Sequence, residues 1–154
     1  METAVMEESG DREKQMLYKI QEQFGVQPRD IREYSPLALA YIGDGVYELV
    51  IRTIVVEQAN RPAGDLHRTT VEYVKAQTQA RLFLVLKEEL TEEEADVVRR
   101  GRNAKPYTTA KNASRADYHK ATGFEALMGW LYLTGQTDRL LELIRTGLER
   151  VKLQ

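Results

Sequence analysis

The sequence predicts an all-α protein with a single domain, and three observations carry this prediction. Apolar residues recur at helical spacing along most of the chain. No stretch between turn signals alternates strictly between apolar and polar residues, as a half-buried strand would. Start and stop signals for helices recur in pairs, and the 154 residues are enough for one domain with one core.

Composition restricts the class of protein and its environment. With 42% hydrophobic and 30% charged residues, the chain resembles a globular protein rather than a disordered one. It has no cysteine, which excludes disulfides, thiolate metal sites and thiol nucleophiles. Residues 1–8 are acidic and lack the apolar core of a signal peptide, and no window approaches the roughly 20 apolar residues of a membrane span. We therefore expect a cytoplasmic protein.

Two helices are expected in the first part of the chain. The first covers about residues 12–24 and ends at Gly25, the residue type that most often closes a helix. Ser35 followed by Pro36 is a helix-start signal, with serine as the N-cap and proline at the first position. The helix that they open is expected to continue to about Gln58. Its dense apolar residues predict burial on most of its surface.

Four more helices are expected in the rest of the chain. Asp65 is the expected cap of a helix that continues to Leu86. Thr91, with Glu94 three residues later, forms a capping box for the next helix. The segment 101–116 has few apolar residues and is expected to be a loop. The remaining predicted helices cover about residues 92–102, 117–133 and 137–151.

Asp44 lies inside the expected central helix with a glycine on either side. Each glycine destabilises a helix interior by about 0.5–1 kcal/mol relative to alanine. A buried carboxylate is more unfavourable still unless a positive charge pairs with it. Folding alone does not account for this arrangement. We therefore expect the glycines to admit another backbone at close range, and Asp44 to hold a cation or a metal ion.

Glu125 is the second unusual acid. It is the only charged residue in the apolar stretch 121–133, which predicts a helix buried nearly all round. One interpretation is that an arginine neutralises Glu125 inside the core. The other pairs Glu125 with Asp44 across two packed helices, where two carboxylates would suit Mg²⁺ together with water and phosphate.

Glu48 lies one helical turn after Asp44 and one turn before Arg52. An ion pair with Arg52 is the expected arrangement, and Glu48 is also a candidate for supporting a metal at Asp44 without binding it directly. The two histidines, His67 and His119, have no metal-ligand spacing. We expect His67 on a helix surface, and for His119 either a surface position or a role facing phosphate rather than that of a general base.

Positive charge is concentrated in one segment, although the net charge of the chain is −2. Between residues 99 and 120, a single acid, Asp117, stands among seven cations. Such a segment is typical either of a solvated surface or of a surface that binds phosphate. Because no run of exposed aromatic residues suggests base stacking, recognition of an RNA duplex by its shape is favoured. The candidate RNA-binding residues are Arg99, Arg100, Arg102, Lys105, Lys111, Arg115 and Lys120.

Two motifs resemble those of a known family. Residues 39–46 resemble the signature helix of ribonuclease III nuclease domains, and residues 124–133 resemble their second acidic helix. Residues 34–41 and 99–105 are similar to the small branch called Mini-ribonuclease III, which consists of the nuclease domain alone. The resemblance extends over about residues 30–150.

The resemblance implies the fold and the chemistry of that branch. It implies a ribonuclease III-like helical nuclease domain over residues 30–152, after an extension of residues 1–29 that contains a helix. It also implies a homodimer that uses Mg²⁺ to cut double-stranded RNA, leaving a 5′-phosphate and a short 3′ overhang. Asp44 and Glu125 match the catalytic, metal-binding acids of the family. The known substrate of the branch is the precursor of 23S ribosomal RNA, which implies maturation of its ends.

Two positions depart from the pattern of full-length ribonuclease III. This chain has Ala40 and Thr122 where those enzymes have carboxylates, so it retains two acids of four. A double-stranded RNA-binding domain is also expected to be absent. Duplex binding would then depend on the dimer surface and the basic segment, together with a ribosomal protein bound to the substrate. The missing acids favour an alternative function, a catalytically inactive dimer that binds double-stranded RNA as a scaffold.

Overall fold

The structure of this chain, a computed structural model, describes residues 15–104 and 114–152. These residues form helices and no strand, which confirms the predicted all-α class. The helices are α2 (Met16–Phe24), η1 (Ile31–Glu33), α3 (Pro36–Gln58), α4 (Ala63–Val74), α5 (Ala76–Leu86), η2 (Lys87–Glu89), α6 (Glu92–Asn103), α7 (Arg115–Leu133) and α8 (Thr137–Val151), where η marks a 3₁₀ helix. No helix in these described ranges is long and apolar enough to cross a membrane.

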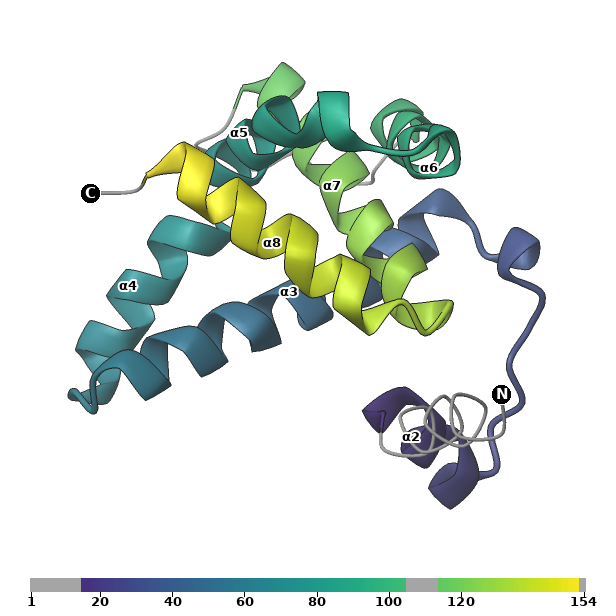
Figure 1. Cartoon of the computed structure of the whole chain (residues 1–154), viewed down its shortest axis with the longest axis horizontal. Coiled ribbons are helices and arrows are strands. Elements are labelled where there is room, and N and C mark those ends of the chain that lie inside the picture. The colour runs from purple at the N-terminus through teal and green to yellow at the C-terminus, as the bar shows by residue number, and fades with distance from the viewer. Residues whose placement is uncertain (1–14, 105–113, 153–154) are drawn as a thin grey trace, which may run out of the picture.

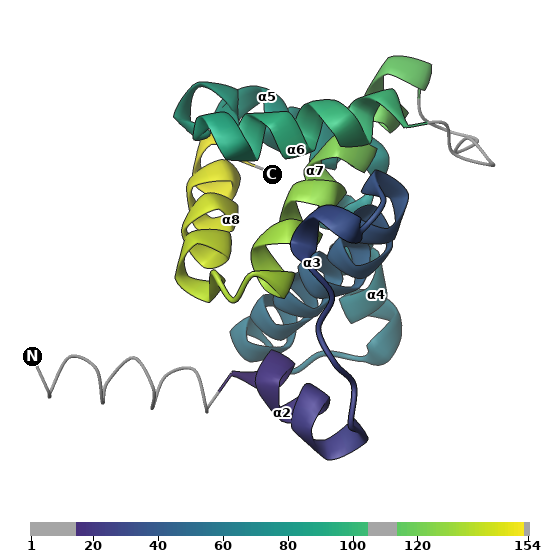
Figure 2. The ribbon, with the colours of Figure 1, turned by 90° about the vertical axis from the view of Figure 1, so that its right-hand side faces the viewer.

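Helix α7 lies at the centre of the molecule. It packs most extensively against α3, α6 and α5, and α8 also contacts it (Figure 1). Turned by 90°, α8 and α3 lie on opposite sides of α7, while α5 and α6 lie across its upper end (Figure 2). A helix surrounded in this way must be apolar on nearly every side, as residues 121–133 are.

The buried core forms where these helices meet. At its centre, the rings of Tyr47 in α3 and Phe124 in α7 meet edge to face, with centroids 5.3 Å apart. Tyr47 is fully buried, and its hydroxyl donates a 2.7 Å hydrogen bond to the carbonyl oxygen of Tyr73 in α4. The other large, fully buried side chains include Ile51, Leu82, Leu86, Leu127, Met128, Leu131, Leu143 and Ile144.

The predicted helix ends agree with the structure where local hydrogen bonds define them. The Ser35 hydroxyl oxygen accepts a 3.1 Å hydrogen bond from the Ala38 N–H, and α3 begins at Pro36 as expected. Thr91 and Glu94 form both hydrogen bonds of the predicted capping box of α6. Gly25 closes α2 with a φ of +60°, a conformation that favours glycine.

The helix predicted from Asp65 to Leu86 is wrong in two respects. It begins earlier, at Ala63, and it is divided at Lys75, whose ψ of 154° is extended. The side chains of Thr78 and Gln79 stabilise this break by donating hydrogen bonds to the carbonyl oxygens of Glu72 and Val74, at 2.6 and 2.7 Å. In a continuous helix, backbone N–H groups would donate to these two carbonyl oxygens, and here side chains donate to them instead. The break lets α4 and α5 follow different sides of the core.

The loop predicted over residues 101–116 is shorter than expected at both ends. Helix α6 continues to Asn103, and α7 begins at Arg115, where the hydroxyl oxygen of Ser114 accepts a 3.0 Å hydrogen bond from the Asp117 N–H. Ser114 is the N-cap of α7 and was the sequence signal for this start, but the segment around it has few apolar residues and so resembles a loop.

The prediction that α3 is buried on most of its surface is also wrong. One face of α3 packs on α7 and the core, whereas the other carries exposed apolar residues, including Tyr41, which is 83% exposed, and Leu49 and Val56. A high apolar content therefore predicted the helix correctly but not its environment.

A buried ion pair ties the start of α6 to α8. The guanidinium of Arg139 donates two hydrogen bonds of 2.9 Å to the carboxylate of Glu94, whose residue is only 2% exposed, and one of 2.9 Å to the Glu89 carbonyl oxygen. Burial alone would raise the pKa of Glu94, but the hydrogen bonds and charge of Arg139 and the Thr91 cap lower it below its ordinary value. Arg139 is not recognisable from the sequence as the partner of Glu94, because the two residues are distant in the chain.

Candidate active site

The candidate site is formed where α3 crosses α7. Two glycines, Gly43 and Gly129, lie at the crossing and bring the two backbones into contact. A Cβ built on Gly43 would overlap the carbonyl oxygen of Glu125 and lie 2.6 Å from the nitrogen of Gly129. A Cβ on Gly129 would overlap the carbonyl oxygen of Leu39 in the same way. Only glycine permits this separation, which places the residue before Asp44 directly against the backbone of Glu125.

The prediction that both glycines beside Asp44 admit a second backbone is correct for one of them. Gly43 meets α7, as described, whereas a Cβ on Gly45 would have no atom within 4 Å. Gly45 lies on the exposed face of α3. Packing within the described chain therefore does not account for a glycine at position 45.

The carboxyl groups of Asp44 and Glu125 face each other across this crossing. Burial, the negative charge of Asp44 and a hydrogen bond between the two side chains, in that order of size, together raise the pKa of Glu125 to about 9. Asp44 itself is exposed and Glu125 half-buried, so the expectation of two deeply buried acids is wrong. The arrangement is instead a surface site with one acid in the wall and one at the rim.

The structure also distinguishes between the two interpretations of Glu125. No arginine forms an ion pair with Glu125 in the described part of the chain, and the charged group that shifts its pKa is Asp44. A half-buried carboxyl beside a second acid is unfavourable when both are ionised, and a cation between them removes that repulsion. The donor set, two hard carboxylates open to solvent, fits Mg²⁺, which binds one or two carboxylates and completes its coordination with water and phosphate.

The two positions that depart from full-length ribonuclease III do not add ligands. Ala40 is buried, and so is Thr122, whose hydroxyl donates a 3.0 Å hydrogen bond to the carbonyl oxygen of Tyr118 within α7. Among the described residues, no group of three or more His, Asp or Glu side chains is arranged to hold a metal. The site thus offers two protein carboxylates, Asp44 and Glu125.

The neighbouring polar residues have other arrangements. Glu48 forms the predicted ion pair with Arg52, at 3.2 Å. His67 is exposed, as expected. His119 is half-buried and packs edge to face against Tyr118, with ring centroids 6.1 Å apart, and its Nδ1 has no hydrogen-bond partner in the described structure. His119 therefore lies only partly at the surface.

The predicted basic residues lie around the end of α6 and the start of α7, but in different surroundings. Arg99 is ion-paired with Asp96, and the guanidinium of Arg102 lies over the Phe83 ring, 5.3 Å from its centroid. Arg115 is exposed and Lys120 half-buried on α7. Lys105 and Lys111 are outside the described residues.

Helix packing brings this basic region to the same helix that carries Glu125. Gly101 of α6 and Gly123 of α7 lie at a second close crossing. A Cβ on Gly101 would lie 2.9 Å from the Cα of Gly123, and one on Gly123 would lie 2.7 Å from the Cγ of Arg102. The aliphatic part of the Arg102 side chain therefore packs against Gly123, which lies two residues before Glu125. This role of the two glycines depends on two helices meeting, and the only signal for it in the sequence is a small residue in each of them.

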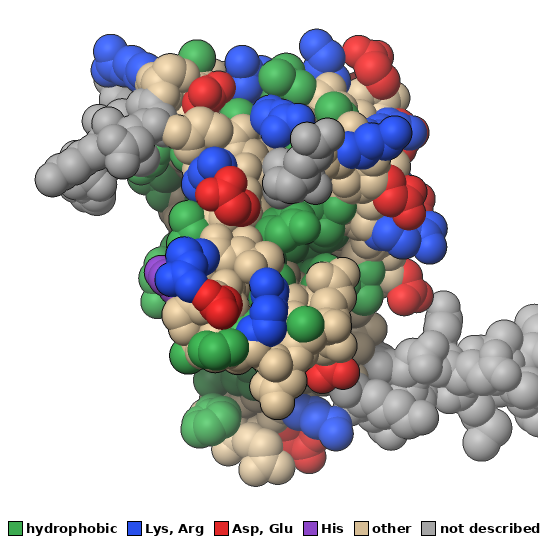
Figure 3. Space-filling model, turned by 90° about the vertical axis from the view of Figure 1, so that its left-hand side faces the viewer, with side chains coloured by type: hydrophobic (Ala, Val, Ile, Leu, Met, Phe, Trp, Pro, Cys, Tyr) green, Lys and Arg blue, Asp and Glu red, His purple; other side chains and the backbone are tan. Residues whose placement is uncertain are grey.

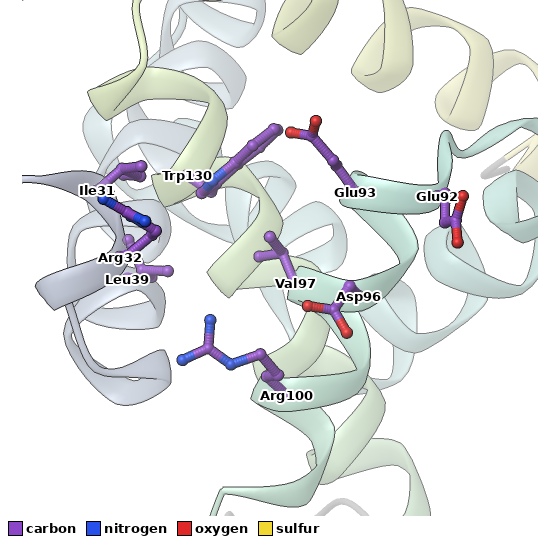
Figure 4. Close-up of a pocket in the computed structure, with 9 residues that line it drawn as sticks. All are labelled: Ile31, Arg32, Leu39, Glu92, Glu93, Asp96, Val97, Arg100 and Trp130. Carbon is purple, nitrogen blue, oxygen red and sulfur yellow. The ribbon is translucent and has the colours of Figure 1, made fainter.

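Arg100 points away from this crossing. It lines a hollow of about 560 Å³ between the start of α3, α6 and α7, together with Leu39, Val97 and Trp130 (Figure 4). In Figure 4, Glu92, Glu93 and Asp96 of α6 lie along one side of this hollow. Neither Asp44 nor Glu125 lines it. The hollow is therefore separate from the pair of acids.

Comparison with known proteins agrees with this geometry. Residues 37–136 match the ribonuclease III domain family. The Mini-ribonuclease 3 of Thermoanaerobacter sp. (strain X514) is 49% identical over 118 residues, covering 77% of this chain and 83% of that protein. The Mini-ribonuclease 3 of Enterococcus faecalis is 47% identical over 125 residues, covering 80% of this chain and 95% of that protein. A crystal structure of a Fusobacterium nucleatum protein matches with a TM-score of 0.73 at 29% identity, covering 81% of this chain and 99% of that one.

The helical fold and the family match define a ribonuclease III domain, which is an endoribonuclease. Within that class, the similarity to Mini-ribonuclease 3 proteins extends over more than three quarters of the chain. The chain therefore belongs to the Mini-ribonuclease III branch of the ribonuclease III family.

Proposed function

We propose that this protein is a Mg²⁺-dependent endoribonuclease for double-stranded RNA, with Asp44 and Glu125 as its catalytic, metal-binding residues. The observation that carries the proposal is the direct approach of these two carboxyl groups at the α3–α7 crossing, with the pKa of Glu125 raised to about 9. Pairs of acids whose surroundings perturb their pKa values are typical of functional sites.

Asp44 and Glu125 would hold the metal ion that carries out the cleavage chemistry. When bound, Mg²⁺ would polarise the scissile phosphate and lower the pKa of an attacking water, so no side chain needs to be a covalent nucleophile. Glu125, in the wall, would release its proton as the metal binds, because a protonated carboxyl is a poor ligand. The Gly43–Gly129 contact would keep the two groups at a constant separation.

We propose that the basic residues at the end of α6 and the start of α7 bind the phosphate backbone of the duplex. Arg115 and Lys120 are in α7, the helix of Glu125, and Arg102 packs against this helix at Gly123. Arg99 and Arg100 lie on other sides of α6, and Lys105 and Lys111 are in the connecting segment. Arginine and lysine contacts to phosphate bind without reading sequence. The site would then recognise a stem by its shape.

The remaining functional assignments follow from the branch. We propose a homodimer, supported by the exposed apolar face of α3 with Tyr41 beside Asp44. A dimer would present two sites, each cutting one strand. We further propose a cytoplasmic role in trimming 23S ribosomal RNA precursors, with a ribosomal protein on the substrate, and a nuclease domain of residues 30–152 after an extension of residues 1–29.

A scaffold that binds double-stranded RNA without cutting it is the second candidate. The observation that favours it is that Ala40 and Thr122 supply no carboxylate, which leaves two protein ligands for metal. The experiment that separates the two functions is incubation of the purified protein with a labelled RNA duplex, in Mg²⁺ and then in EDTA.

The nuclease assignment predicts cleavage in Mg²⁺ alone, with 5′-phosphate products. Asp44→Asn should abolish cleavage while duplex binding and oligomeric state stay unchanged, because asparagine keeps the shape of the side chain but not its charge. Glu57→Gln, an exposed acid at the end of the same helix, is the matched control. Cleavage by Asp44→Asn at the wild-type rate would refute the proposed site, and duplex binding without any cleavage by the wild type would establish the scaffold.

A further inference from the structure

An apolar groove runs between α3 and α8, away from the pair of acids. Two hollows of about 570 and 260 Å³ share Ile54, Leu148 and Glu149, so they form one continuous groove. Leu49 and Leu141 lie at one end, both largely exposed, and Tyr73 lies at the other. Figure 3 shows hydrophobic side chains in a hollow on the side of the molecule where α4 and the end of α8 lie. A groove of this character is typical of a site for an amphipathic helix.

A second uncovered apolar surface lies on α2. Met16, Ile20 and Phe24 follow one another at intervals of four residues and are all exposed, Phe24 by 77%. Four-residue spacing places them on one stripe of the helix. Figures 1 and 2 both show α2 to one side of the helical body, and no other described helix packs along it. The stripe therefore faces solvent over its whole length.

The chain's own body holds α2 in a way that leaves this stripe outward. Leu17 is buried, and the Tyr18 hydroxyl packs against Gly135 in the turn between α7 and α8, where a Cβ would overlap it. Gly135 has a φ of +73°, so both its backbone and this contact call for glycine. For α2 to enter the groove of its own chain, these contacts would have to be given up. A second copy can cover the stripe without disturbing them.

The stripe and the groove also agree in length and in charge. From Met16 to Phe24 the stripe is about 12 Å long, and the groove follows α8 from Leu141 to Lys152, about 16 Å at 1.5 Å per residue. Lys19 flanks the stripe, and Glu149 stands at the rim of the groove. In the described residues neither has an ion-pair partner within its own chain. An α2 helix seated in the groove can bring these two charges together.

We propose that α2 of one copy of this chain docks in the α3–α8 groove of a second copy, and that the exchange is reciprocal. Ile20 and Phe24 would occupy the groove beside Leu49 and Leu141. The contact rests on the proposed self-association but not on RNA cleavage. A reciprocal exchange buries the same surfaces twice about one two-fold axis, which closes the assembly at a dimer.

Disulfide cross-linking tests this docking cleanly, because the chain has no cysteine of its own. Ile20→Cys is made in an untagged chain and Leu141→Cys in a tagged chain, and the two are co-expressed and then oxidised. Leu84→Cys replaces Leu141→Cys in the control. Leu84 is 43% exposed and Leu141 44%, but Leu84 lies on α5, outside the groove.

The docked arrangement predicts a disulfide between the untagged and tagged chains for the 20–141 pair. It should form at least about tenfold faster than for the 20–84 pair, because thiols held in one complex meet at an effective concentration near millimolar. Equal rates for the two pairs would overturn the proposal. So would an internal disulfide in monomers that carry both Ile20→Cys and Leu141→Cys, because α2 would then occupy its own groove.

Two further measurements on the same samples keep this proposal distinct from the proposed function. Sedimentation that shows a dimer without the 20–141 disulfide would refute the docking and leave self-association standing. Cleavage of an RNA duplex by the same variants reports on Asp44 and Glu125 alone, whichever way the cross-linking comes out.

Discussion

The two glycines that flank Asp44 in α3 should respond in opposite ways to replacement by alanine. Gly43→Ala places a methyl group on the carbonyl oxygen of Glu125 and 2.6 Å from the nitrogen of Gly129. Both of these are backbone atoms, so no side chain can turn away and the two helices must separate. Gly45→Ala places the same methyl group in open space. The two substitutions are chemically identical and lie in the same helix.

The magnitude follows from two terms. Replacing glycine by alanine in a helix interior stabilises the folded state by about 0.5–1 kcal/mol, and this gain applies at both positions. Overpacking costs about 1–3 kcal/mol or more, and it applies at Gly43 alone. The helix gain cancels between the two variants, so we expect Gly45→Ala to be more stable than Gly43→Ala by the overpacking cost of about 1–3 kcal/mol. In a chain of this length that difference separates the melting temperatures by roughly 2–12 °C.

The assay is urea unfolding of both variants and the wild type, followed by circular dichroism at one protein concentration, because self-association makes stability depend on concentration. Duplex cleavage should fall with Gly43→Ala, since separating α3 from α7 separates Asp44 from Glu125, and should persist with Gly45→Ala. Equal midpoints for the two variants would refute the close backbone crossing. A Gly43→Ala variant that is destabilised but fully active would refute its role in positioning the acids.

Three other predictions follow from particular contacts. Because the folded-state pKa of Glu125 is raised to about 9, the metal-free protein should lose stability as the pH rises from about 4.5 to 9. For the same reason, Mg²⁺ binding near neutral pH should release about one proton per site, which calorimetry in buffers of different ionisation enthalpy measures. Mg²⁺ binding without proton release would contradict this prediction. Arg139→Ala should destabilise the fold by about 3–5 kcal/mol, because it leaves the buried Glu94 unpaired. Glu142→Ala removes only a surface ion pair and should cost under about 1 kcal/mol in the same urea titration; similar losses would show that the Arg139–Glu94 pair is not a buried tie. Replacing Arg99, Arg100 and Arg102 of α6 by alanine should weaken duplex binding and lower the salt dependence of the binding constant by about one power per lost phosphate contact. The control is Arg29→Ala, which removes an exposed arginine outside the basic region and should change neither quantity.

The acid pair shows how far sequence reasoning reached. Asp44 between glycines and Glu125 in an apolar helix were both recognisable as residues that folding alone does not require. Their approach to each other was one of two interpretations until the α3–α7 crossing was known. Their depth was misjudged, because an apolar helix that packs on one side and faces outward on the other has the same composition as a buried one.

The basic segment shows a different limit. Its charge was evident, but Arg99, Arg100 and Arg102 turned out to point to an acid, a hollow and an aromatic ring respectively. Successive residues of a helix project about 100° apart, so a run of cations in sequence becomes a ring of cations in space. Which of them faces an RNA duplex depends on what the neighbouring helices cover.

By itself, the sequence determined the all-α class, the Gly25 end of α2, both ends of α3, the capped start of α6, and the two acids that stand out from their surroundings. Helix caps and ion pairs one turn apart involve residues close together in the chain, so local hydrogen bonding decides them. Only the tertiary structure decided that Gly43, and not Gly45, meets α7, that α4 and α5 separate at Lys75, and that Arg139 anchors Glu94. These depend on contacts between residues far apart in the chain, where packing selects one arrangement among several that the local pattern allows.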